Sequence, residues 1–412
     1  VLDLSNNQLS SLPADLGRLQ HLRILFLSSN QFDHVPDVLS DCPKLEMIGF
    51  KSNQIKTVSE DALPVDTRWL ILTDNKIEKL PDSMGQLHRL QKLALAGNQL
   101  TELPSSMANC RNLELARLSA NKLTALPDWL FQLPKMSWLA FSGNSFNKGT
   151  FNEEASEVPM VKVNMANIQL NHQLGEGASG VIHHANWVKQ PASLKSADSE
   201  IAVKVFKGEV TSDGYPQDEL NCCLTAGEHP NLIKVIAKIT QKNQLGLVMK
   251  LIPESFYNLG LPPSLVTCTR DTFEEGTTFT PEQMTKIAFS MCDALTHLHK
   301  NGVSHGDVYA HNIMIDDQAS VLFGDFGAAS NLSLLPQMQR EAMESVEVRA
   351  FACLLEDLLA HNAESYDSGL IAALSELKNT CMHEDTVFRP RFNEIKNQLQ
   401  SLLVQPELEF TF

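Results

Sequence analysis

The sequence predicts a multidomain protein in which a repeat array precedes a domain that lacks the repeat. Two observations support this prediction. The chain has 412 residues, more than one ordinary hydrophobic core holds. Through its first third, an asparagine also recurs at intervals of 22 or 23 residues, a regularity that indicates stacked structural repeats. The marker asparagines are Asn7, Asn30, Asn53, Asn75, Asn98, Asn121 and Asn144.

Each repeat carries apolar residues five and three positions before its marker asparagine. This alternation predicts one short strand per repeat with one face buried. The asparagine can then satisfy backbone groups where the chain turns out of the strand. The apolar pairs are Leu2/Leu4, Leu25/Leu27, Ile48/Phe50, Leu70/Leu72, Leu93/Leu95, Ala116/Leu118 and Leu139/Phe141.

With the Leu-Pro pairs that follow several markers, such as Leu80-Pro81, the pattern resembles the leucine-rich repeat family. The resemblance implies an α/β solenoid over residues 1–146, curved around a parallel sheet on its concave side. The outward strand positions are small and nearly uncharged, apart from Phe26 and Ile71. We expect a protein substrate or regulator to bind this face. A structural or autoregulatory role for the array is the alternative.

The repeat period ends near Phe146. Residues 147–166 carry several acidic residues and Pro159, which predicts a connection between two units. Because it is short, the two units can pack on each other. We expect them to be separable, so that removal of residues 1–146 alters activity or partner choice and not the chemistry. Residues 403–412 are predicted to form a C-terminal tail.

A glycine-rich motif, LGEGASGVI, opens the second domain and places glycines at Gly175, Gly177 and Gly180. Such a motif also occurs in dinucleotide-binding folds, where it opens a helix. Here the strand-like run VIHHANWV follows it, which favours a loop between two strands that covers nucleotide phosphates. The next run, IAVK, ends at Lys204, which can hold phosphates as a point charge.

Further along, His305, Asp307 and Asn312 have the spacing H-x-D-x-x-x-x-N, and Asp325 begins an Asp-Phe-Gly triplet. Together with the glycine loop and IAVK, these motifs resemble the protein kinase superfamily over residues 167–402. The resemblance implies an α+β domain of two lobes that uses ATP and Mg²⁺. It also implies that Asp307 accepts the proton of the attacking hydroxyl and that Asn312 and Asp325 bind Mg²⁺.

The resemblance also implies a carboxylate that orients Lys204. Glu219 is our first choice, with Asp218 and Glu228 as neighbouring alternatives. Adenine is expected between apolar residues of the two lobes, with its edge against a hinge. The predicted adenine-site residues are Ile182 and Ala202 above, Met314 below, Met249 as gatekeeper, and Lys250, Leu251 and Ile252 as the hinge.

Three features depart from the family pattern. Gly306 replaces an arginine that pairs with a phosphorylated activation loop, so activity should not require that phosphorylation. Tyr309 replaces a lysine that neutralises the γ-phosphate, so His311 or a basic group elsewhere must substitute, or transfer is slower. No Ala-Pro-Glu triplet precedes the helical stretch that begins at Val346. Arg389 matches a late structural arginine of the family.

The predicted function is an ATP-dependent protein kinase acting on serine or threonine. The departures keep two alternatives open: a nucleotide-binding pseudokinase scaffold, and a small-molecule phosphotransferase of the aminoglycoside or choline kinase type. The joined modules resemble the soluble leucine-rich repeat kinases of bacteria. Plant receptor kinases place a membrane helix between the two modules, whereas only a short polar and mixed segment lies there in this chain.

Composition indicates which partners and which cellular compartment to expect. The net charge of −16 disfavours nucleic acid as a partner. The sequence has neither a run of 18 apolar residues nor a basic patch, so it does not predict a membrane partner. The eight cysteines form no CxxC pair, which argues against disulfides or zinc and predicts a reducing, cytoplasmic setting. Since Val1 lies inside a repeat and no methionine precedes it, we expect further residues upstream.

Overall fold

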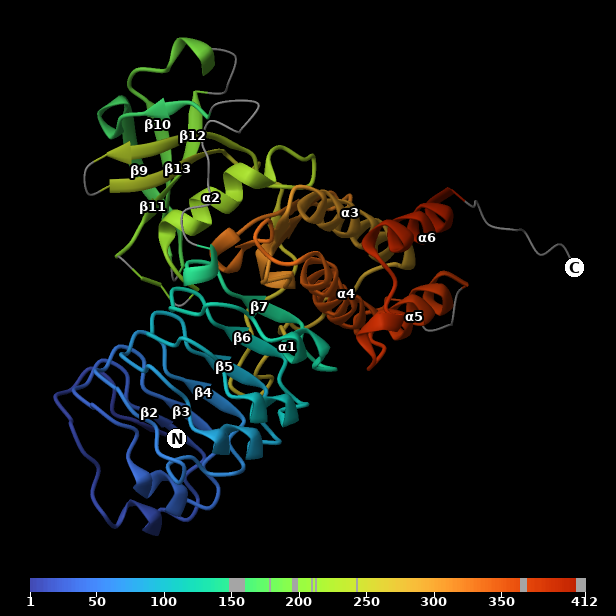
Figure 1. Ribbon diagram of the computed structural model, residues 1–412. Coiled ribbons are helices and arrows are strands. Elements are labelled where there is room, and N and C mark those ends of the chain that lie inside the picture. Colours follow the sequence, from blue (N-terminus) through green and yellow to red (C-terminus); the bar gives the residue numbers. More distant parts are fainter. Residues whose placement is uncertain are drawn as a thin grey trace, which may run out of the picture.

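The array and the second domain lie side by side in the computed structural model (Figure 1). The structure describes residues 1–147, 160–177, 179–194, 199–208, 210–211, 213–241, 244–363 and 369–404. Most of the expected connection over 147–166, and most of the expected tail over 403–412, lie outside the described residues. No helix within the described ranges has the length and apolar character needed to cross a membrane.

The array is built on a parallel sheet with one short strand from each repeat, paired in chain order. Facing residues come from equivalent repeat positions, as where Leu25 pairs with Ile48. The predicted solenoid sheet is therefore present. Its strands are β1 (Leu2–Asp3), β2 (Ile24–Phe26), β3 (Met47–Gly49), β4 (Trp69–Ile71), β5 (Lys92–Ala94), β6 (Leu115–Arg117) and β7 (Trp138–Ala140).

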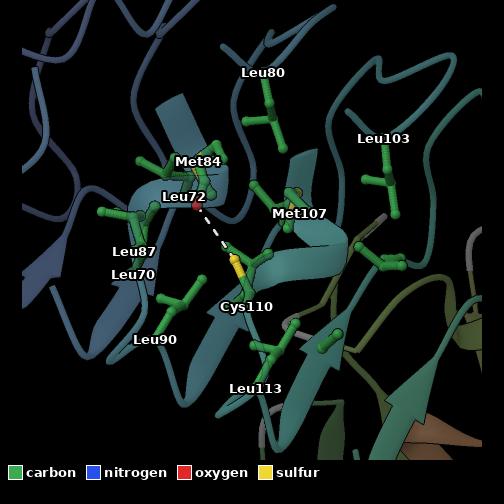
Figure 2. Close-up of a cluster of buried hydrophobic side chains, with 14 of the residues drawn as sticks. Leu70, Leu72, Leu80, Met84, Leu87, Leu90, Leu103, Met107, Cys110 and Leu113 are labelled. Carbon is green, nitrogen blue, oxygen red and sulfur yellow. Dashed lines mark hydrogen bonds between the residues drawn. The ribbon is translucent and has the colours of Figure 1, made fainter. Parts of the chain in front are cut away.

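Short helices lie on the other side of the array and close its core. Figure 2 shows Leu70 and Leu72 facing Met84 and Met107, with Cys110 donating a hydrogen bond to the carbonyl of Met84 at 3.2 Å. The helical segments are η1 (Leu16–Arg18), η2 (Asp37–Asp41), η3 (Asp82–Gln86), η4 (Ser105–Asn109), α1 (Asp128–Gln132) and η5 (Ser145–Asn147).

The marker asparagines link each repeat to the one before it. In the third repeat, the side-chain amide nitrogen of Asn53 donates to the carbonyls of Phe50, at 3.1 Å, and Leu27, at 2.9 Å. Its oxygen accepts the N–H of Phe32 at 3.1 Å. An amide can both donate and accept, which explains why asparagine recurs at this buried turn.

The small lobe of the second domain is a six-stranded sheet with the order β8-β12-β13-β11-β10-β9 and one helix, α2 (Pro216–Ala226). Its strands are antiparallel except for β8, which pairs in parallel with β12. Part of the predicted connection, residues 162–163, is thus a strand of this sheet. The strands are β8 (Lys162–Val163), β9 (Ile168–Glu176), β10 (Gly180–Trp187), β11 (Glu200–Phe206), β12 (Val235–Gln241) and β13 (Gln244–Lys250).

The large lobe is mainly helical. Helix α3 begins after Thr280, whose hydroxyl accepts the N–H of Gln283 while the Gln283 side chain accepts the N–H of Thr280, a reciprocal cap. The helices are α3 (Pro281–Lys300), α4 (Gln337–Ala360), α5 (Gly369–Cys381) and α6 (Phe392–Val404). The strands are β14 (Tyr257–Asn258), β15 (Val303–Ser304), β16 (Ile313–Ile315), β17 (Val321–Phe323) and β18 (Ser330–Asn331).

The array and the large lobe share hydrophobic core. Trp138 of β7 is buried within the core of the large lobe, and Leu335 and Val346 of the large lobe belong to the core of the array. The last strand, β7, and helix α1 both contact α4 (Figure 1). A repeat array needs a cover over its terminal repeat, and here the large lobe provides it. The expectation that the two units are separable therefore needs revision.

Candidate active site

A buried ion pair lies between β11 and α2. The Nζ of Lys204 on β11 donates a hydrogen bond to Oε1 of Glu219 on α2. A carboxylate oxygen of Asp325, from the large lobe, lies 3.6 Å from the same Nζ. Burial alone would lower the pKa of Lys204, but the charges of Glu219 and Asp325 outweigh it and raise that pKa. Lys204 is therefore a fixed cation that joins the two lobes.

The two alternative partners of Lys204 lie elsewhere. Asp218 faces the array, since a Cβ added to Gly143 would come within 2.6 Å of its Oδ2. The carboxylate of Glu228 accepts a hydrogen bond from Nζ of Lys234 at 2.9 Å on the surface. Of the three candidates, the structure places Glu219 against Lys204.

The loop before β16 carries the second polar cluster. The Nδ2 of Asn312 donates to Oδ2 of Asp307 at 2.9 Å and to the carbonyl of Asp307 at 3.0 Å. These bonds use the amide nitrogen of Asn312 and not its oxygen, the atom that would bind a cation. Fully buried His305 donates from Nε2 to the carbonyl of Gly324 at 3.0 Å. Burial lowers the pKa of His305, so its ring is neutral and links this loop to β17.

Asp325 lies where the large lobe meets the Lys204–Glu219 pair. Its backbone is left-handed, with φ 59° and ψ 78°, and its Oδ1 accepts the N–H of Gly327 at 3.3 Å. Half of its side chain, 51%, is exposed. The Asp325 carboxylate and the Asn312 amide are hard oxygen ligands of the type that Mg²⁺ prefers. The residues present therefore fit a magnesium ion, which Asn312 and Asp325 would hold.

The glycine motif joins two strands, as predicted. Gly175 lies at the end of β9, Gly180 begins β10, and the N–H of Gly177 donates to the carbonyl of Gly180 at 2.9 Å. A Cβ added to Gly180 would lie 2.6 Å from the Val205 carbonyl, so close strand packing requires glycine there. At Gly175 and Gly177 an added Cβ would meet nothing within 4 Å. Both positions border open space, which fits a loop that approaches phosphates.

The predicted adenine-site residues come from neighbouring strands. Ile182 pairs with Lys204 across β10 and β11, and Ala202 pairs with Met249 across β11 and β13. Met314 lies on β16 of the large lobe.

The hinge residues lie directly after β13. Lys250, Leu251 and Ile252 line a cavity of about 600 Å³, together with His229 and Ile233. Ile182 and Met314 are not among its lining residues, so the cavity shares the hinge with the predicted adenine site but not its roof or floor.

His311 is paired with an acidic side chain. Its Nδ1 lies 2.8 Å from Oδ1 of Asp271, which is buried. Burial would lower the pKa of His311, but the hydrogen bond and charge of Asp271 outweigh it and raise that pKa. The charge of His311 is therefore already paired, which weakens the hypothesis that it replaces the missing lysine at position 309.

Arg117, a residue of the array, reaches this site, and the sequence interpretation missed it. Its Nε lies 2.8 Å from Oδ1 of Asp213, in the segment before α2. One terminal nitrogen donates to the Gly306 carbonyl at 2.9 Å, and the other donates to Oδ1 of Asp307. The side chain is only 8% exposed. One signal was available: Arg117 is a charged outward residue in a row of small ones.

The three departures from the family pattern coincide with contacts of the array. At Gly306, φ is 72°, and an added Cβ would lie 2.5 Å from the Ala328 carbonyl of the large lobe and 3.0 Å from the Leu139 carbonyl on β7. Any larger side chain would therefore push against both the large lobe and the array. Tyr309 is buried and its ring stacks on Trp138, with 4.5 Å between centroids and an interplanar angle of 8°.

The start of α4, where the triplet is missing, also contacts the array, since Nε2 of Gln339 donates to the Leu126 carbonyl at 2.9 Å. Arg389, the late arginine of the large lobe, donates to the carbonyl of Pro134 in the array at 2.8 Å. It also donates to the carbonyls of Ser345 and His383 at 2.9 Å. The array thus contacts all three places at which the sequence differs from its family.

Two family models match the chain. Residues 168–371 match the model "Protein tyrosine and serine/threonine kinase". Residues 1–63, 66–123 and 89–146 match the model "Leucine rich repeat". These matches confirm the two families that the sequence motifs indicated.

Curated relatives match mainly through the second domain. A protein of Dictyostelium discoideum named as a probable serine/threonine-protein kinase is 22% identical over 281 residues, or 59% of this chain and 28% of the relative. The serine/threonine-protein kinase STY46 of Arabidopsis thaliana is 23% identical over 279 residues, or 58% and 45%. Fibroblast growth factor receptor 1 of Xenopus laevis is 19% identical over 241 residues, or 57% and 30%.

The chain therefore spans less than half the length of each of these relatives. None of the three is bacterial, and the predicted bacterial affiliation stays a hypothesis.

Proposed function

Because this chain joins a leucine-rich repeat array to a protein kinase domain, we propose that it is an ATP-dependent protein kinase. The reaction is transfer of the γ-phosphate of Mg-ATP to a serine or threonine hydroxyl of a protein. One observation carries the proposal: Lys204, Glu219 and Asp325 meet between the lobes, and the Asp307–Asn312 pair lies on the large-lobe side. A scaffold that only binds nucleotide does not need the Asp307–Asn312 pair.

The proposed roles follow from the contacts. Lys204, held by Glu219, would bind ATP phosphates beneath the glycine loop. The oxygen atoms of Asn312 and Asp325 would hold Mg²⁺, which when bound neutralises phosphate charge. Asp307, oriented by Asn312, would accept the proton of the attacking hydroxyl. Adenine would lie between Ile182, Ala202 and Met314, beside Met249 and Leu251.

The test is incorporation of γ-labelled phosphate from Mg-ATP, into the chain itself and into generic protein substrates. We expect labelling by the native protein and a loss of at least about 100-fold in the Asp325→Asn variant, because the amide removes the negative charge that holds the cation. Asp316→Asn is a matched control, since Asp316 caps a surface turn through the N–H groups of Gln318 and Ser320. Phosphoamino-acid analysis of the product tests the serine/threonine preference.

Labelling that is equally strong in Asp325→Asn contradicts the site assignment. If the native chain binds ATP but labels no protein, a screen for ADP release with amino-sugar and amino-alcohol substrates separates the two alternatives. Release of ADP would support the small-molecule phosphotransferase, and its absence would support the pseudokinase scaffold.

We propose that protein partners bind the first four repeats, because the later strand face is occupied. Just after β6 and β7, buried Ser119 and Ser142 face the kinase domain: a Cβ added to Gly214 would lie 2.8 Å from the Ser119 side chain, and Ser142 donates to the Ala329 carbonyl at 2.8 Å. Phe26 and Ile71 are only half-buried. The cytoplasm is the proposed location, since all eight cysteines are free thiols.

A further inference from the structure

Positive charge is scarce where phosphoryl transfer would occur. Asp213, Asp307 and Asp325 all carry carboxylates near the junction of the lobes, and Glu219 adds a fourth. Among the described residues, Lys204 and Arg117 are the basic residues that form ion pairs with this group. Phosphoryl transfer depends on cations placed around the phosphate. Each of these two positive charges therefore has a large effect on the site.

Two positions of the kinase domain that could supply another cation beside Asp307 do not do so. Tyr309 is uncharged, and its ring is stacked under Trp138 of the array. His311 is paired with buried Asp271. In the described part of the chain, Lys92 of the array interacts with Asp307 and Asp213 through charge but forms no ion pair with either. Within the described part of the chain, Arg117 is the basic side chain that forms an ion pair with Asp307. It comes from β6 of the repeat array and not from the kinase domain.

The contacts of Arg117 hold it in one orientation. Its Nε is anchored on Asp213 of the small lobe and one terminal nitrogen on the Gly306 carbonyl of the large lobe, which leaves the other for Asp307. The planar guanidinium has its donors in a rigid fork, so two anchors fix the direction of the third. Asp307 and Asp213 raise the pKa of Arg117 despite its burial, so it remains charged. A charge held in this way needs no rearrangement during the reaction.

Resting on the proposed kinase activity, we propose that Arg117 is a positioning residue of the phosphotransfer centre that the repeat array supplies. In the reaction, the substrate hydroxyl oxygen bonds to the γ-phosphorus and its proton passes to the Asp307 carboxylate. The bond between the γ-phosphorus and the β–γ bridging oxygen breaks, and its electron pair leaves with ADP. Arg117 exchanges no proton. It holds Asp307 in place and keeps a positive charge beside it.

The test compares the native chain with Arg117→Gln and Arg117→Lys in two measurements. The first is kcat and KM for ATP in phosphate transfer. The second is the affinity for Mg-ADP with and without aluminium fluoride, which together mimic the transition state and need no protein substrate. We expect Arg117→Gln to lower kcat by about 100-fold and to remove the gain in ADP affinity that aluminium fluoride produces. The KM for ATP and the affinity for Mg-ADP alone should stay within about threefold, which also shows that the variant is folded.

Arg117→Lys keeps the charge but loses the fork, so we expect it to recover part of kcat. Arg68→Gln is the matched control, because Arg68 is an array arginine that donates to the Val266 carbonyl of the large lobe at 3.0 Å, away from Asp307. The Arg68→Gln variant should have the same kcat, the same KM for ATP and the same response to aluminium fluoride as the native chain.

Three results would overturn the inference. An Arg117→Gln variant with unchanged kcat and unchanged response to aluminium fluoride shows that the arginine only joins the two units. A rise in kcat shows that the array inhibits the kinase. A native chain that labels no protein but binds ADP more tightly with aluminium fluoride, through Arg117, contradicts the proposed substrate class and supports the inference. A native chain that labels no protein, and whose affinity for Mg-ADP aluminium fluoride does not change, contradicts both the proposed function and the inference.

Discussion

Replacement of Trp138 by alanine is expected to destabilise the large lobe together with the array, by about 3–5 kcal/mol in the free energy of unfolding. Trp138 lies on the last array strand, yet only 1% of it is exposed and its ring stacks on Tyr309. Its Nε1 donates to the Val308 carbonyl at 3.0 Å. The substitution would leave a cavity between the two units beside the catalytic loop, residues 303–315, which carries the proposed catalytic residue Asp307. A urea titration followed by far-ultraviolet circular dichroism measures the loss.

Trp69 provides a matched control. It lies six residues before its marker Asn75, as Trp138 does before Asn144. Trp69 is half-buried, and its ring contacts Phe26 and Lys92, both of the array. We expect Trp69→Ala to cost clearly less and to leave nucleotide affinity unchanged. Equal losses for the two tryptophans would show that the contact with the large lobe contributes nothing special to stability.

The second large effect is expected at Lys204. A Lys204→Met variant should lose phosphate transfer by at least about 1,000-fold, because it removes a preorganised cation from a site with few of them. Methionine also leaves Glu219, which is 3% exposed, buried without its partner. Removing one member of a buried pair is costly, so the melting temperature should fall as well. Transfer rates and thermal unfolding, measured on the same samples, separate the two effects.

Lys234→Met is the comparison for Lys204→Met. Lys234 forms an ion pair with Glu228 at 2.9 Å on the surface, where such pairs contribute little. It should transfer phosphate like the native chain. A Lys204→Met variant that keeps full activity would show that another group binds the phosphates.

The repeat array could be predicted because its information is local. From Asn30 onward, the marker asparagines meet the same need, as Asn75 shows: its amide nitrogen donates to carbonyls in its own repeat and the one before, and its oxygen accepts the N–H of Ile55. One residue type therefore recurs at a constant spacing. The glycine loop was predictable for the same reason, since Gly180 has no room for a side chain.

Residues brought together by tertiary contacts could not be predicted in this way. Arg117 lies 190 positions before Asp307 in the chain, and no spacing rule connects an array strand to a catalytic loop. Trp138 and Tyr309 meet over a similar separation. Gly306 and Tyr309 were noticed as departures, but their contacts with Leu139 and Trp138 of the array are not readable from the second domain's own sequence.

Strand β8 likewise could not be predicted from its own sequence. Its two residues, Lys162 and Val163, carry no distinctive pattern, and the surrounding segment was predicted to be a connection. They become a strand because β12 offers an edge, where the N–H of Lys238 bonds to the Val161 carbonyl at 2.9 Å. Edge pairing of this type depends on what lies beside a segment and not on its own composition.

We expect the array and the kinase domain to unfold as one unit, because they share hydrophobic core. Hydrogen exchange across a series of urea concentrations tests it most directly, with peptides from 115–141 of the array and 303–315 of the catalytic loop compared in the same sample. We expect the amides of both peptides to become exposed to exchange with the same free energy of opening and the same dependence on urea. Protection that persists in the catalytic loop after the array has opened would contradict it.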